Sequence, residues 1–148
     1  QAYPEVPGLP AQMARLAREE SSHLAKVLAV MDERGLTLGR DGGAPYAKGL
    51  QRLLRAGQKE RRLDRLLVAG IIEARSHQRL ELLADGLPEA ALRKLYAELA
   101  QSEDGHQQLF VRLAREVEEP ARAEARLEQL LAGEAKLLAT LPLRAAIH

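Results

Sequence analysis

The stretch "SEDGH", residues 102–106, places a glutamate and a histidine three residues apart in a segment whose apolar residues recur with the period of a helix. The stretch "REESSH", residues 18–23, repeats that spacing with Glu20 and His23. At about 100° per residue, both pairs fall within or beside the apolar face of their helices. An unpaired ionised carboxylate in an apolar core costs several kcal/mol. The repeated pattern therefore predicts that a cation shares the core with these side chains.

The composition predicts an all-α protein. The 148 residues are 46% hydrophobic but only 3% aromatic, so leucine and alanine must fill the core. Together with glutamate, arginine and lysine they are strong helix formers, and almost no segment has the alternating pattern of a strand. The length suits a single domain spanning residues 1–148.

Glycine and proline positions divide the chain into helices. Gly35 and Gly86 fit helix ends, and Pro120 closes the segment before it. The predicted helices span residues 11–34, 46–55, 61–84, 88–118 and 121–140.

The composition also excludes several kinds of site. Because the chain has no cysteine, disulfides, thiolate metal sites, iron–sulfur clusters and a cysteine nucleophile are excluded. No apolar run approaches membrane-spanning length, and the first ten residues resemble neither a signal nor a transit peptide, so we expect a cytoplasmic protein without a membrane partner. The net charge of +1 gives no global attraction to nucleic acid, so such affinity must come from local clusters.

A further core acid extends the metal-binding pattern. Glu73 falls on the apolar face of the predicted helix 61–84, between the two Glu-x-x-His copies. Each copy offers a carboxylate oxygen and an imidazole nitrogen on one helix face. Ferritin-like di-iron and di-manganese proteins use two such copies and one glutamate from each of two other helices. Five of these six expected ligands are present: Glu20, His23, Glu73, Glu103 and His106.

Two more titratable residues have open roles. His77 lies one turn after Glu73 and is either a residue that orients a metal ligand or a hydrogen-bonded core histidine. Glu134 lies on the apolar stripe of the last predicted helix. It is a candidate sixth ligand, and the alternative is a protonated or rim-exposed glutamate.

Basic residues gather around the loop before the predicted helix 61–84. They either contact phosphates or form an ordinary solvated helix end. Aromatic side chains that stack on bases are scarce, so a target base would be held largely by shape and apolar contact. The cluster consists of Arg52, Arg55, Lys59, Arg61, Arg62 and Arg65.

Three segments carry a resemblance to a known family: "LAREESSHLAKVL", "IIEARSHQRLELLA" and "LYAELAQSEDGHQQLFVRLA". They resemble the MiaE-type hydroxylases of 2-methylthio-isopentenyladenosine in tRNA, which are ferritin-like di-iron monooxygenases. The resemblance spans nearly the whole chain from Tyr3 onward and is most specific in "IEARS" followed by the S-E-x-x-H segment. It implies a ferritin-like helical bundle with two non-haem iron ions, whose ligands are Glu20, His23, Glu73, Glu103 and His106.

The resemblance implies that O₂ is the co-substrate, that the isopentenyl side chain is hydroxylated, and that no catalytic residue is needed beyond the metal centre. No flavin or iron–sulfur site is visible, so a separate electron-donor reductase is also implied. The family supplies another glutamate from a helix preceding the segment that matches Gln1, so this first core helix is expected to be missing here. A shortened bundle would expose apolar faces, which favours a homodimer.

Other classes of function remain open. One is a different ferritin-like metalloprotein, such as a peroxidase, a manganese catalase or an iron-handling protein, and another is a truncated, catalytically incomplete bundle. A third is a metal-free helical interaction module whose acids pair with His77 and buried arginines. That module predicts that Glu20→Ala or Glu103→Ala destabilises the metal-free fold, whereas metal binding predicts relief of charge repulsion and loss of iron.

Overall fold

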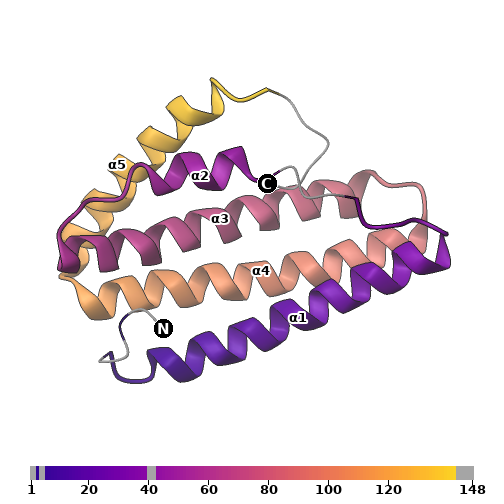
Figure 1. The fold of residues 1–148 in the computed structure, drawn as a ribbon, viewed down its shortest axis with the longest axis horizontal. Helices are drawn as coiled ribbons and strands as arrows, with labels where there is room; N and C mark the ends of the chain where they lie inside the picture. Colours follow the sequence, from indigo (N-terminus) through magenta and orange to yellow (C-terminus); the bar gives the residue numbers. More distant parts are fainter. Residues whose placement is uncertain (1–2, 4–5, 40–42, 143–148) are drawn as a thin grey trace. The chain divides into compact units, whose positions relative to one another are not determined.

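The computed structural model describes residues 3, 6–39 and 43–142, and most of them are helical. This described part contains five helices and no strand, which confirms the all-α prediction (Figure 1). Apart from α2, each helix begins and ends within three residues of its predicted bounds. None of these helices combines the length and apolar character that crossing a membrane requires. The helices are α1 (Leu9–Glu33), α2 (Pro45–Gln51), α3 (Gln58–Gly86), α4 (Ala90–Val117) and α5 (Pro120–Leu138).

The chain divides into two compact units, Gln1–Gly43 and Ala44–His148. The first unit contains α1, and the second contains α2 to α5. The expected single domain over residues 1–148 stays a prediction. In the first unit, Gly35 ends α1 with a positive φ of 63°, and its N–H donates to the Asp32 carbonyl at 2.9 Å. Glycine adopts this left-handed conformation without a Cβ clash, which explains the predicted stop.

In the second unit, α3 and α4 lie side by side and run in opposite directions (Figure 1). Their apolar faces meet, and α2 and α5 pack against this pair. The two helices pack in ordinary van der Waals contact at Gly70 of α3, where an added Cβ would lie 3.4 Å from the Phe110 Cβ of α4. The buried core is mainly leucine, as the composition predicts, and includes Leu63, Leu66, Leu67, Val68, Ile71, Leu80, Leu99, Phe110, Leu113 and Leu130.

Helix α2 ends at Gln51 rather than at the predicted residue 55, because a buried acid captures the backbone that follows. The backbone N–H of Arg55 donates to the Asp64 carboxylate at 2.8 Å. The Arg126 guanidinium donates to the Leu53 carbonyl and to Asp64, both at 2.9 Å. Burial alone would raise the pKa of Asp64, but hydrogen bonds from Arg126 and Arg55 lower it to about 2. Asp64 therefore stays ionised and holds the turn formed by residues 52–57.

Candidate metal centre

The first Glu-x-x-His copy lies on α1. His23 Nδ1 is 3.6 Å from a carboxylate oxygen of Glu20. The Glu20 side chain is 47% exposed, so the expectation that it is buried is wrong. Leu24, which lies four residues after Glu20 and so belongs to the same apolar stripe, is 55% exposed. The reason is that the described part of the first unit contains no helix besides α1 and therefore offers no second apolar face to bury that stripe.

The second copy and Glu73 come together in the second unit. His106 Nδ1 on α4 lies 3.8 Å from Glu103 Oε2 on the same helix and 3.9 Å from Glu73 Oε2 on α3. The side chains of His106, Glu103 and Glu73 are only 5%, 10% and 17% exposed. Three predicted ligands from two helices thus surround one buried point, as the inward phase of Glu73 predicts.

These separations fit a metal ion better than they fit direct hydrogen bonds. A hydrogen bond between nitrogen and oxygen is about 2.7–3.2 Å long, so both contacts of His106 Nδ1 are too long. Two donors that each bind one ion at about 2.1 Å lie roughly 3–4 Å apart, which is the separation found here. Imidazole nitrogen with carboxylate oxygen is a donor set suited to divalent transition metals, iron among them.

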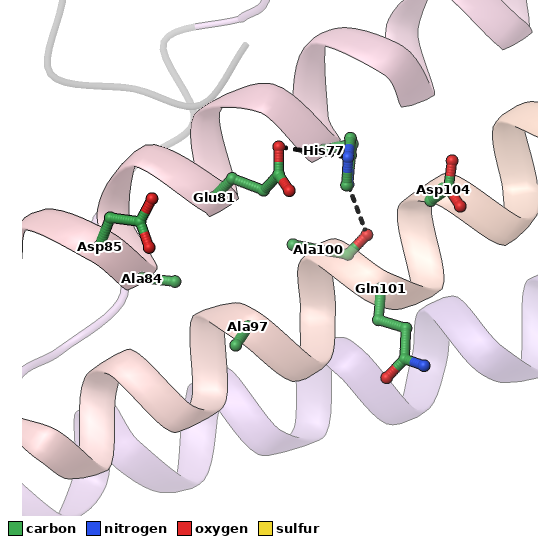
Figure 2. A pocket seen from close by; sticks show the side chains of 8 residues that line it. All are labelled: His77, Glu81, Ala84, Asp85, Ala97, Ala100, Gln101 and Asp104. Carbon is green, nitrogen blue, oxygen red and sulfur yellow. Dashed lines mark hydrogen bonds and ion pairs between the residues drawn. The ribbon is translucent and has the colours of Figure 1, made fainter.

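His77 bridges α3 and α4 on the surface of a groove of about 340 Å³ (Figure 2). Its Nδ1 lies 2.8 Å from the Ala100 carbonyl, which can only accept, so Nδ1 donates. Its Nε2 lies 3.3 Å from a carboxylate oxygen of Glu81. The geometry matches the hydrogen-bonded histidine, while a role in orienting a metal ligand stays a prediction.

Glu134 of α5 is fully buried and pairs with Arg75 of α3. Arg75 Nε and one terminal nitrogen donate to its two oxygens at 2.7 and 2.8 Å, and the Tyr46 hydroxyl donates at 2.5 Å. Burial would raise the pKa of Glu134, but hydrogen bonds from Arg75 and Tyr46 lower it. Burial and the bond to Glu134 raise the pKa of Tyr46. Because these donors engage its carboxylate, we leave Glu134 out of the proposed ligand set.

The sequence carried a signal for this pair that the analysis of apolar faces missed. Arg75 follows Glu73 by two residues, which places it about 200° around α3, on the side away from the predicted ligand. That side also carries Leu67 and Ile71, both buried. An arginine among apolar neighbours requires an acid partner, and Glu134 supplies it.

The predicted basic cluster lies on the turn 52–57 and the first turns of α3. Arg55 is engaged by the buried Asp64, with its Nε and terminal nitrogen 2.7–3.2 Å from the carboxylate oxygens. Arg62 and Arg65 are engaged in other interactions. The remaining members are Arg52, Lys59 and Arg61.

Similar proteins identify the family. Residues 2–148 match the family described as tRNA-(MS[2]IO[6]A)-hydroxylase (MiaE). A Pseudomonas putida protein named tRNA 2-(methylsulfanyl)-N(6)-isopentenyladenosine(37) hydroxylase is 38% identical over 126 residues, which cover 85% of this chain and 61% of the relative. A Salmonella typhimurium protein of the same name is 33% identical over 106 residues, covering 72% of this chain and 39% of the relative. The chain thus spans less than two thirds of the length of either curated relative.

A solved structure shares the fold. It is titled Protein 43 with aldehyde deformylating oxygenase activity from Synechococcus, and it matches with a TM-score of 0.87 and 39% identity over 96% of this chain and 70% of that one. This similarity confirms the predicted all-α, ferritin-like fold class. The match over residues 2–148 and the 38% identity to a curated relative show that this chain belongs to the MiaE family.

Proposed function

We propose that this chain provides the metal-binding helices of a di-iron oxygenase that hydroxylates the isopentenyl side chain of 2-methylthio-isopentenyladenosine in tRNA. The observation that carries the proposal is the buried contact of His106 with Glu73 and Glu103, at distances that suit ligands of one ion. Family membership supports the substrate, because both curated relatives are named for this modified nucleoside.

In this proposal two iron ions are held by Glu20 and His23 of α1 and by Glu73, Glu103 and His106 of α3 and α4. Such a centre supplies the oxidising power that an unactivated C–H bond requires, with O₂ as co-substrate. The carboxylates balance the charge of the ions, and the histidines add neutral donors. Leu99, Phe110 and Leu113 are buried on the helix face that carries Glu103 and His106, and they keep water from that side of α4.

The remaining parts of the proposal concern partners. Electrons come from a separate reductase, since the chain has no cysteine for an iron–sulfur cluster of its own. A cytoplasmic location follows from a tRNA substrate, and a homodimer stays a prediction.

Iron content and oxygen transfer test the proposal together. The protein is loaded anaerobically with Fe(II), the iron bound per folded chain is measured, and tRNA carrying the methylthio-isopentenyl nucleoside is then added with O₂ and a reductant. We expect close to two irons and a nucleoside heavier by one oxygen atom in mass spectrometry. Glu103→Gln, which changes a proposed ligand, should lower the iron bound per chain. Glu116→Gln, which changes an exposed acid of the same helix α4, is its matched control and should not. One iron or none with the fold intact would instead indicate a catalytically incomplete bundle.

An aldehyde oxygenase is the second candidate function. The Synechococcus structure titled with that activity is 39% identical to this chain, which is as close as the tRNA-hydroxylase relative at 38%. The same iron-loaded protein should therefore be offered an aldehyde, with formate as the product measured. Formate release without any change in the tRNA nucleoside would favour this second function.

A further inference from the structure

The basic residues near the start of α3 are of two kinds. Arg55 and Arg126 both converge on Asp64, whose side chain is 0% exposed, and they share its single negative charge. Arg126 also holds the Leu53 carbonyl at 2.9 Å. These two arginines therefore fix the turn 52–57, and their guanidinium groups are already engaged within the protein.

Arg52, Lys59 and Arg61 are the second kind. Their side chains make no hydrogen bond or ion pair within residues 3, 6–39 and 43–142. Arg52 and Lys59 are exposed, and Arg61 is half-buried. Three uncompensated cations thus project from a backbone that Asp64 holds in place.

Two neighbouring cations at this end of the second unit are already paired. The turn 52–57 lies at the same end as the junction of α4 and α5 (Figure 1). There Arg115 pairs with Glu124 at 3.1 Å, and Arg122 lies 3.9 Å from Glu118. Arg52, Lys59 and Arg61, together with the exposed Arg112 near the end of α4, therefore carry the positive charge that stays unbalanced at this end.

We propose that the turn 52–57 and the first turn of α3 form a phosphate-binding surface for a folded RNA. Arg52, Lys59 and Arg61 contact phosphates, and Arg55, which is held by Asp64, contacts none. The choice of RNA rests on the proposed function. It is supported by the chemistry of the surface, because Leu53 and Leu54 are half-buried and no large apolar side chain projects from residues 52–61 to anchor a protein or a lipid.

The salt dependence of binding separates the two kinds of residue. Each phosphate contact releases counterions, so the slope of log K against log salt changes by roughly 0.7–0.9 per contact. With an unmodified tRNA transcript as the probe, Arg52→Gln, Lys59→Gln and Arg61→Gln should each make the slope shallower by about that amount, and the triple variant by roughly 2–3. Arg55→Gln should leave the slope unchanged, because Arg55 contacts no phosphate.

A triple variant of exposed cations elsewhere, on α1, α4 and α5, R18Q/K94Q/K136Q, makes the same change in net charge and should keep the wild-type slope. The proposal is overturned if the control variant makes the slope as much shallower as R52Q/K59Q/R61Q does. It is also overturned if Arg55→Gln makes the slope shallower by as much as the single variants of Arg52, Lys59 and Arg61 do. If the wild type hydroxylates tRNA while R52Q/K59Q/R61Q keeps the full slope, the surface is wrong and the function stands. If the slopes behave as expected and no hydroxylation occurs, the surface stands and the proposed function fails.

Discussion

Replacing Asp64 by asparagine should destabilise the fold, because the carboxylate is fully buried between Arg55 and Arg126. The difference between the ordinary pKa of 3.8 and the value of about 2 corresponds to about 2.5 kcal/mol of stability at neutral pH. Asparagine also leaves Arg126, which is 14% exposed, without a counter-charge, whereas Arg55 is 41% exposed and can turn to water. We therefore expect a loss of about 3 kcal/mol for Asp64→Asn, at the low end for a broken buried pair.

Urea unfolding followed by circular dichroism measures this loss, with Asp85→Asn as the control because Asp85 is exposed. Since the folded-state pKa of Asp64 lies below its unfolded value, its contribution is present above about pH 4 and disappears as the pH falls towards about 2. The wild-type and Asp64→Asn curves should therefore converge over that range. A difference below about 0.5 kcal/mol at pH 7, or one that does not change between pH 5 and pH 2, would refute the reasoning.

Three further changes test other parts of the molecule. Tyr46→Phe removes a donor to the buried Glu134 and should cost about 1–2 kcal/mol in urea unfolding, whereas Tyr96→Phe should cost almost nothing; equal effects would contradict the role of that bond. Phe110→Ala should cost about 3–5 kcal/mol of stability, because the ring is 6% exposed between α3 and α4. The control Leu82→Ala should cost almost nothing, because that side chain is 72% exposed. Thermal melts measure both losses, and a small loss for Phe110→Ala would show that the core closes around the gap. Glu103→Gln should lower the iron bound per chain without lowering the urea stability of the metal-free protein; a destabilised metal-free protein would support the interaction module instead.

The helix bounds could be predicted because their signals are local. Gly35 and Pro120 act within one turn of their own positions, and the apolar stripes follow the helical period. The end of α2 could not be predicted in this way. It depends on Arg126, which is far along the chain from the turn it holds, and no local pattern reports such a contact.

In the candidate site, too, local spacing predicts which helix face a residue occupies but not which residue of another helix it contacts. The spacing of Glu103 and His106 fixes their shared helix face, and the phase of Glu73 predicts that it points toward them. The phase of Glu134 correctly places it in the core, but only the fold shows that Arg75 is its partner. The burial expected for Glu20 failed because the period of a helix does not specify what packs against its apolar stripe.

The hydrogen bond from His77 to the Ala100 carbonyl restricts where the chain can gain or lose residues. It crosses the same helix pair as the contact between Glu73 and His106, one turn away. One residue inserted in α3 between Glu73 and His77 would turn one contact about 100° away from the other, so both could not be kept. A residue added to the connection at 87–89 changes neither helix. Among relatives, insertions and deletions should therefore gather in that connection and avoid the segments 73–77 and 100–106.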